Sequence, residues 1–338
     1  MTFVIMSGGI DLSVGSVMAL CGVALGLSTT TVPPPFIAYA AAVLPAFIGI
    51  LAMSASVRRF GWPIGLRARN GLAPAFGLLL IFLIGQATIR ACQAGVGLAF
   101  GLFVALSVGV CCGLINGLVV TRGSVPPFVA TLGMLTAARG LTVYATDGNS
   151  VSGLPQALGH VGQGAPLIAV ALSSALIGGL VLTRTRMGRY ITAIGVNVEA
   201  ARLSGVNFAF VKTTAYAVSG LTAAIAAVLL TAKFRLADTG AGANAELSAI
   251  AAVVIGGGSL SGGLASVAGS LVGALTIAVL NAGLVLVGIP DTLQGVIIGA
   301  VIVVTVMIDQ QQRRAQARGT GALRERAAAT PRREIGEQ

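Results

Sequence analysis

Apolar runs of about 20 residues follow one another along almost the whole of this chain, and each is long enough for a helix to cross about 30 Å of hydrocarbon. Only 9% of its 338 residues are charged and 56% are hydrophobic, an excess that a water-soluble core of this size does not need. The sequence therefore predicts an all-α, polytopic bundle of transmembrane helices with about ten spans. The predicted spans are residues 1–28, 36–53, 72–89, 95–120, 128–144, 166–182, 213–230, 246–258, 264–287 and 292–308.

The cations gather beside the predicted spans. They cluster at residues 58–69, at 184–212 and in the tail 309–338, and the net charge is +11. Arginine and lysine next to membrane helices mark the cytoplasmic side. An even number of spans puts all three clusters on that side, so we count the short run 246–258 as a crossing and expect both termini to be cytoplasmic.

Several kinds of site are disfavoured. The cations are not interleaved with aromatic residues along a groove, so we expect no nucleic-acid partner. No histidines are grouped and no cysteines have metal-ligand spacing, so we expect neither a metal site nor catalytic residues. The glycine cluster at 256–263 is not followed by a lysine that would bind phosphate, and it predicts a flexible turn. Small packing residues are the expected role of Cys21, Cys92, Cys111 and Cys112.

A basic segment at 184–212 interrupts the apolar pattern with five cations and a single acid. Asn197 can cap a helix, Glu199 would lie in its first turn, and Arg202 would lie in its last. Gly205 is a natural stop. The segment predicts a short helix of about two turns from Asn197 to Gly205. An ordinary basic cytoplasmic loop is the alternative interpretation.

The first apolar run is interrupted at Ser7–Ser13, where two glycines precede Asp11. A carboxylate facing lipid costs about 2.5–3.5 kcal/mol, so Asp11 should face a bundle interior, an aqueous pathway or a membrane edge. The glycines would allow the helix to break inside the protein. A reverse turn at the membrane surface, with Asp11 capping the next helix, explains the pattern equally well.

Three sets of small residues predict close helix packing. Glycines four residues apart let a neighbouring backbone approach. The glycine sets are Gly109, Gly113 and Gly117, then Gly269 and Gly273, then Gly295 and Gly299.

One cation lies within a predicted span. Arg139 should snorkel, pair with another group or line the interior.

Four motifs occur in order along the chain. They are SGGIDLSVGS at 7–16, PPFVATLGMLTAARGL at 126–141, MGRYITAIGVNVEAARLSGVN at 187–207 and ELSAIAAVVIGGGSLSGG at 246–263. Together they closely resemble the permease subunits of ribose/xylose-type ABC sugar importers, a branched-chain-type permease superfamily. The resemblance runs from about residue 1 to residue 309.

The resemblance implies a multi-pass subunit in a bacterial inner membrane that pairs with a second permease copy, identical or closely related. A cytoplasmic ABC ATPase would bind ATP and Mg²⁺ below it, and an extracytoplasmic sugar-binding protein would dock above, while this chain would hold no cofactor. The resemblance also implies a set of ATPase-coupling residues: Arg189, Gly195, Asn197, Glu199, Ala200, Ala201, Arg202 and Gly205. From their polarity or motif positions, the predicted translocation path contains Asp11, Asn116, Phe128, Thr131 and Arg139.

The domain organisation follows from these patterns. Residues 1–308 form the predicted permease domain, with 184–212 as its cytoplasmic coupling loop, and 309–338 form a disordered basic tail. Extra length relative to the family predicts an inserted hairpin at 30–93. Two other functions remain open. Broken helices and Asp11 also suit an ion-coupled secondary transporter, and the short lead before Ser7 leaves a truncated, non-transporting paralogue possible.

Overall fold

A computed structural model describes residues 1–30, 36–41, 86 and 97–290, together with scattered positions between 293 and 307. The regular structure in these ranges is helical, and one isolated antiparallel bridge joins Val151 to Ala237. The all-α prediction is confirmed. By length and composition, five of the described helices could cross a membrane.

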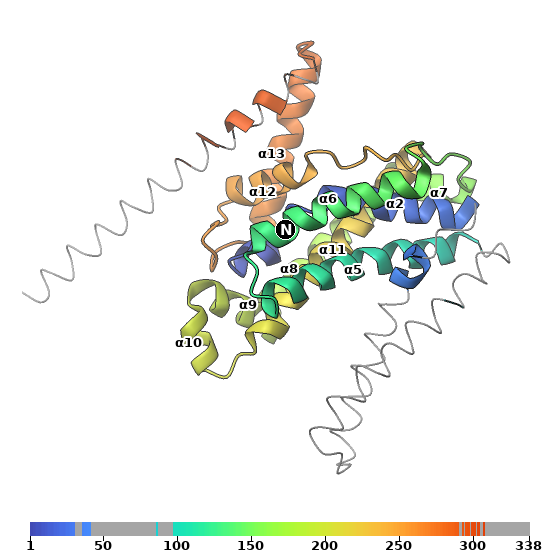
Figure 1. Ribbon diagram of the computed structural model, residues 1–338. Helices are drawn as coiled ribbons and strands as arrows, with labels where there is room; N and C mark the ends of the chain where they lie inside the picture. The colour runs from blue at the N-terminus through green and yellow to red at the C-terminus, as the bar shows by residue number, and fades with distance from the viewer. Residues whose placement is uncertain are drawn as a thin grey trace, which may run out of the picture.

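The helices are α1 (Thr2–Met6), α2 (Val14–Thr30), α5 (Leu98–Thr121), α6 (Pro127–Thr146), α7 (Gln156–Val161), α8 (Gly164–Arg184), α9 (Arg186–Val196), α10 (Val198–Leu203), α11 (Phe208–Phe234), α12 (Ala245–Ile255) and α13 (Val267–Leu286). The candidate spans are α5, α6, α8, α11 and α13. In Figure 1 the bundle formed by α2, α5, α6 and α11 has α10 at one end and α7 at the other. We call these the α10 end and the α7 end.

The antiparallel pair α5 and α11 forms the centre of the bundle. A methyl group added at Gly109 would overlap the backbone of Gly220, and one at Gly113 would overlap the Tyr216 carbonyl oxygen. One added at Gly117 would lie 2.6 Å from the Thr213 Cα. The prediction that these three glycines bring a neighbouring backbone close is confirmed, because small residues let membrane helices touch along their backbones.

The main apolar core surrounds this pair. Helix α2 packs against α5, α6 and α11, and its side chains Val17, Cys21 and Leu25 are buried. Cys112 of α5 belongs to the same core, and Cys111 is also buried. The three cysteines in the described ranges are free thiols in apolar surroundings, as expected of small packing residues.

Two interruptions break the helical pattern inside the bundle. The first separates α1 from α2 at Ser7–Ser13, where the sequence predicts a break. The second begins after α11, where residues 235–244 turn back along α2. A methyl group added at Gly26 would lie 3.1 Å from the Ala237 Cβ, and one at Gly15 would overlap the Gly242 carbonyl oxygen.

The return path leads into the short helix α12. Helix α12 has 11 residues and rises about 16 Å, which is roughly half of the hydrocarbon thickness. The non-helical segment 237–244 runs from the α7 end along α2, and α12 then continues toward the α10 end (Figure 1). Ala237 at the start of this segment is buried, whereas Asp238, Gly240, Ala243 and Asn244 are exposed.

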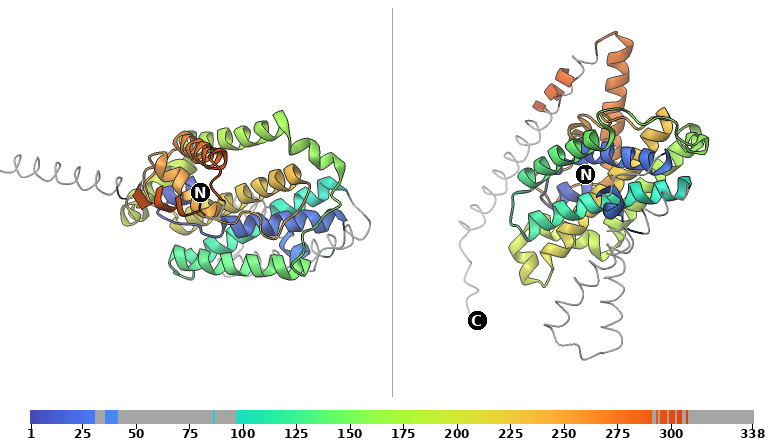
Figure 2. Two further views of the ribbon diagram at one scale, coloured as in Figure 1. Left: turned by 90° about the horizontal axis from the view of Figure 1, so that it is seen from above. Right: turned by 45° about the vertical axis from the view of Figure 1, so that its right-hand side comes forward.

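Helices α8 and α13 cover the bundle only partly. Leu182 is the buried residue of α8, and α13 buries Gly273 and Ile277. Figure 2 shows α8 standing apart from the α2, α5 and α6 layer over most of its length. Both helices leave apolar side chains exposed. Such a surface suits contact with membrane lipid or with another apolar helix.

The two other predicted glycine sets have different outcomes. Added methyl groups at Gly269 and Gly273 would overlap the carbonyl oxygens of Gly256 and Ala252, so close packing of α13 on α12 is confirmed. The described residues show no close packing at Gly295 and Gly299. A methyl group at either position meets nothing within 4 Å among the described residues.

Other predictions lie outside the described residues. They are the arginine cluster at 58–69, Cys92, the tail 309–338, most of the inserted segment 30–93, and most of the spans 36–53, 72–89 and 292–308.

The α5–α11 contact yields a stability prediction. Gly113→Ala should lower the free energy of unfolding by about 1–3 kcal/mol, because the new methyl group has no room against the Tyr216 backbone. Gly283 on α13 is the matched control, since a methyl group there meets nothing within 4 Å. Gly283→Ala should be neutral or stabilise by up to about 1 kcal/mol. Thermal unfolding of the detergent-purified protein measures both, and equal effects would contradict the close contact.

Candidate functional site

The segment 184–212 folds as two short helices followed by the start of α11. Thr185 caps α9, and its Oγ1 accepts a hydrogen bond from the Gly188 amide at 3.4 Å. Ile191 and Ile194 of α9 are buried, whereas Arg189 is exposed. This amphipathic pattern seats α9 on the bundle. The sequence interpretation did not distinguish α9 from the rest of the basic segment.

Helix α10 has the predicted caps. The Asn197 Oδ1 accepts from the Ala200 amide at 3.0 Å, and Gly205 has a φ of +81°, which suits a residue without a Cβ. Glu199 and Arg202 lie 3.6 Å apart in an exposed pair, which contributes little stability. The short capped helix is confirmed, with Asn197 and Gly205 flanking its six helical residues.

One face of α10 is held and the other is free. Ala201 is buried in a cluster with Ile191, Ile194 and Val211. Leu203 points away from this cluster and is 90% exposed. Apolar surface at a helix tip is costly to leave in water. The α10 end therefore presents a compact, capped helix with an apolar tip and a charged rim.

The eight predicted coupling residues do not share one environment. Gly195 lies against the backbone of Met6 and Gly263, and Ala201 is buried, so these two face the protein itself. The six exposed positions are Arg189, Asn197, Glu199, Ala200, Arg202 and Gly205.

A buried polar network surrounds the first interruption. The Asp11 Oδ1 accepts from the Ser13 amide at 3.0 Å and from the Ser13 hydroxyl at 2.6 Å. The Asp11 Oδ2 accepts from the Ser219 hydroxyl at 2.7 Å, and Asn116 donates to the Ser13 Oγ at 2.9 Å. Asp11 is 2% exposed, so it faces the interior as predicted, and it also orders the start of α2.

One face of α11 supplies the partners of this interruption. Lys212, Tyr216 and Ser219 follow the i, i+4, i+7 spacing of a single helix face. The Lys212 Nζ donates to the Gly8 carbonyl oxygen at 3.4 Å, and the Tyr216 hydroxyl donates to the Ile10 carbonyl oxygen at 3.2 Å. The sequence interpretation missed these residues and Ser13. Their spacing places them on one helix face, but it does not predict which segment that face contacts.

The five predicted path residues separate into three places. Asp11 and Asn116 belong to the buried network, and Thr131 is near it, with its Oγ1 3.4 Å from the Ile10 carbonyl oxygen. Phe128 is 53% exposed at the start of α6. Arg139 donates to the carbonyl oxygens of Thr239 and Ala241 at 2.6 and 3.4 Å, so it pairs with the non-helical segment rather than snorkelling.

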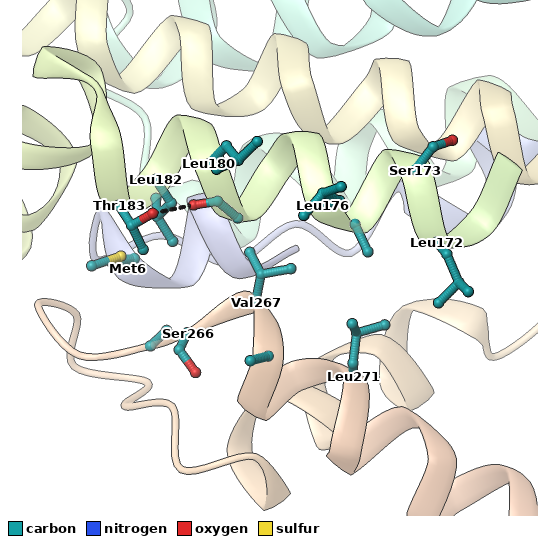
Figure 3. Close-up of a pocket in the computed structure, with 14 residues that line it drawn as sticks. Met6, Leu172, Ser173, Leu176, Leu180, Leu182, Thr183, Ser266, Val267 and Leu271 are labelled. Carbon is teal, nitrogen blue, oxygen red and sulfur yellow. Dashed lines mark hydrogen bonds between the residues drawn. The ribbon is translucent and has the colours of Figure 1, made fainter. Parts of the chain in front are cut away.

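Two of the cavities among the described residues differ sharply in polarity. One, of about 630 Å³, lies between α8 and the start of α13, and its walls are almost entirely apolar (Figure 3). Leu172 and Leu176 enter it from α8, facing Val267 and Leu271 of α13. The other, of about 710 Å³, lies at the α7 end and is lined by polar groups that include His160, Gln163 and Arg235. Among the described residues, no group of three His, Cys, Asp or Glu side chains could hold a metal ion.

The Asp11 network yields a prediction with a matched control. Asp11→Ala should lower the free energy of unfolding by about 1–3 kcal/mol, because buried donors lose their acceptor. Asp238 has the same bonding pattern at an exposed position, since its Oδ1 accepts from the Gly240 amide and the Ser150 hydroxyl. Asp238→Ala should cost less than about 0.5 kcal/mol. Thermal unfolding compares the two, and an equal loss would refute a special role for the buried network.

Comparisons with known proteins agree with this architecture. The chain is 36% identical over 276 residues to the ribose import permease protein RbsC of Bacillus subtilis (strain 168), covering 72% of this chain and 82% of that protein. It is 38% identical over 252 residues to the galactofuranose transporter permease protein YtfT of Escherichia coli (strain K12), covering 73% of each. The xylose transport system permease protein XylH of the same strain is 31% identical over 304 residues, covering 70% of this chain and 77% of that protein.

No solved structure matches this one. The family model described as "Branched-chain amino acid transport system / permease component" matches residues 61–306, which is most of the chain. This chain therefore belongs to that family of transport permeases, and it is a membrane permease subunit and not an enzyme.

Proposed function

We propose that this permease forms the membrane path of an ATP-driven sugar importer of the ABC type, and that a separate cytoplasmic ATPase binds it at α10. The relatives support a sugar as the cargo, because their names specify ribose, galactofuranose and xylose. The family description names branched-chain amino acids instead. The experiment below distinguishes the two kinds of cargo.

The exposed face of α10 is the observation that carries this proposal. This six-residue helix has a side-chain cap at its start and a glycine stop after its end, so both of its ends are well defined. Its buried face fixes it on α9 and α11, while the 90% exposed Leu203 is available to a partner. Such a helix can enter a groove on another protein as a rigid unit.

The charge distribution supports a cytoplasmic location for the α10 end. Arg122, Arg184, Arg186, Arg189 and Arg202 all lie at or beyond the membrane-helix ends on this side. Because cationic loops remain in the cytoplasm, the ATPase would reach α10 from below. We propose a bacterial inner membrane, about ten spans and two cytoplasmic termini on the same grounds.

The exposed surfaces of the bundle suggest where the other subunits of the importer would bind. An extracytoplasmic sugar-binding protein would dock at the α7 end, where the polar cavity lies. A second permease copy would cover part of the apolar surface that α8 and α13 leave exposed. ATP and Mg²⁺ would be held by the ATPase, and this chain would bind no cofactor.

The burial of the predicted path residues suggests different roles for them. We propose that Phe128 contacts the sugar, because its aromatic ring is exposed and can stack against a sugar ring. Asp11, Asn116 and Thr131 would instead hold the interrupted helix beside the path, since they are buried and hydrogen-bonded. Arg139 would keep the segment 237–244 in place.

Transport in proteoliposomes tests the proposed function. The chain would be reconstituted with the ATPase and binding protein encoded by neighbouring genes, and uptake of labelled ribose, xylose, galactofuranose and leucine would be measured. ATP-dependent uptake of a sugar is the expected result. Uptake of leucine alone would replace the sugar assignment, uptake without the ATPase would favour an ion-coupled transporter, and no uptake in any condition would favour a non-transporting paralogue.

Coupling through α10 is tested by two substitutions. Gly205→Val forces a β-branched residue into a φ of +81°, which should unwind the end of α10. Glu199→Arg reverses the charge of the first turn, where an acid is favourable. Each should lower sugar uptake per ATP hydrolysed by about tenfold.

Gly148→Val is the matched control for Gly205→Val. Gly148 has a φ of +77°, and, as at Gly205, an added methyl group meets nothing within 4 Å, but it lies next to the end of α6 at the α7 end. The control should retain the ATPase and its normal uptake per ATP. Equal loss in both valine variants would show backbone strain alone and contradict a coupling role for α10.

A further inference from the structure

Three distant segments meet at the α10 end of the bundle. They are Met6–Gly9 at the end of α1 and the start of the first interruption, Gly195 near the end of α9, and Gly262–Gly263 in the turn between α12 and α13. The Gly263 amide donates to the Met6 carbonyl oxygen at 2.9 Å. We call this contact, made by Gly8, Gly195, Gly262 and Gly263, the glycine junction.

The contacts of the glycine junction are made by backbone atoms. A methyl group added at Gly195 would overlap the Met6 carbonyl oxygen and the Gly263 amide nitrogen. One added at Gly262 would lie 2.9 Å from the Gly195 carbonyl oxygen and 3.0 Å from the Gly8 nitrogen and Cα. Backbone atoms cannot rotate away as side chains can, so a movement of α9 would displace the first interruption and the α12–α13 turn.

A second contact path joins α10 to the same place. The Arg202 guanidinium lies 5.0 Å from the centroid of the Phe208 ring, and the Lys212 ammonium lies 5.3 Å from it. Both distances are within the range of cation–π attraction. Lys212 is 7% exposed and also donates to the Gly8 carbonyl oxygen. Arg202 is thereby linked to Gly8 through the Phe208 and Lys212 side chains of α11.

Helix α8 offers a weaker route although it adjoins α9 in the chain. Its buried residue is Leu182, next to the turn at Thr185, and most of its length has no tight contact with the bundle. Displacement applied to α8 would mostly move α8 itself. The packed elements of the bundle are reached through α9 and α11 instead.

We propose that displacement of α10 by the ATPase reaches the first interruption and the α12–α13 turn through the glycine junction and Lys212, and not through tilting of α8. This inference rests on the proposed function, and it makes Gly195, Gly262 and Lys212 positioning residues for transport. The positive φ values of Gly8, Gly262 and Gly263, between +69° and +94°, give the junction backbone conformations that L side chains rarely adopt. A shift there changes the ends of α1, α12 and α13 together.

The test uses the complete importer in proteoliposomes, with sugar uptake per ATP hydrolysed as the readout. Gly195→Ala should lower this ratio by about tenfold while the ATPase still co-purifies. Gly179→Ala on α8 is the matched control, since its methyl group would lie at an ordinary 3.8 Å from the Val267 Cβ, and it should stay within about twofold of the wild type. A normal ratio for Gly195→Ala, or an equal loss for Gly179→Ala, would overturn the proposal.

A second pair of variants tests the Lys212 contact without changing any glycine. Lys212→Met deletes the donor to Gly8 and keeps an apolar stem, and it should lower the same ratio. Lys212→Arg restores a cation and a donor and should recover most of it. Equal ratios for the Met and Arg variants would exclude a role for the Lys212 contact.

Hydrogen exchange on the wild-type complex provides evidence without any substitution. Peptides covering residues 5–12 and 257–264 should change their exchange together when a non-hydrolysable ATP analogue binds, whereas peptides from residues 167–180 of α8 should not. A change confined to α8 would refute the proposed route. Failure of the proposed function itself would be recognised separately, because the wild-type complex would then show no ATP-dependent sugar uptake.

Discussion

Backbone polar groups freed inside an apolar bundle must find partners within the protein, and this requirement organises the permease. The chain interrupts its first helix at Ser7–Ser13, leaving carbonyl groups and the Asp11 carboxylate away from water. Three side chains on one face of α11 bind them: Lys212 at Gly8, Tyr216 at Ile10 and Ser219 at Asp11. Unpaired polar groups there would each cost several kcal/mol, so α11 and the interruption depend on each other.

The close contact between α5 and α11 makes this arrangement possible. Gly109, Gly113 and Gly117 let the two backbones touch, and Asn116 of the same helix then reaches Ser13 of the interrupted segment. Small residues and buried polar groups therefore act together, because an amide side chain can only bridge helices whose axes are close. The second interruption uses the same principle, with Gly15 and Gly242 in backbone contact along α2.

The proposed transport function uses the mechanical consequence of this packing. A capped helix at the α10 end is exposed to a partner on one face and fixed to the bundle on the other. The first interruption and the α12–α13 turn lie against the end of α9, beside α10, and glycine backbones make the contact. Helix interruptions are places where a bundle can bend, because no continuous helical hydrogen-bond ladder crosses them. A force applied at α10 thus arrives where the bundle can respond.

The sequence by itself determined the helical class, the interruption before Asp11, the caps of α10 and the close-packing glycines of α5. Each of these depends on residues near one another in the chain, through apolar length, cap chemistry or helical spacing. Only the tertiary structure decided that Lys212, Tyr216 and Ser219 face the first interruption. It also decided that segment 237–244 returns along α2 and that Gly195 lies against Met6 and Gly263. Their partners lie tens to hundreds of residues away in the chain, and no local pattern specifies which distant backbone a given helix face will meet.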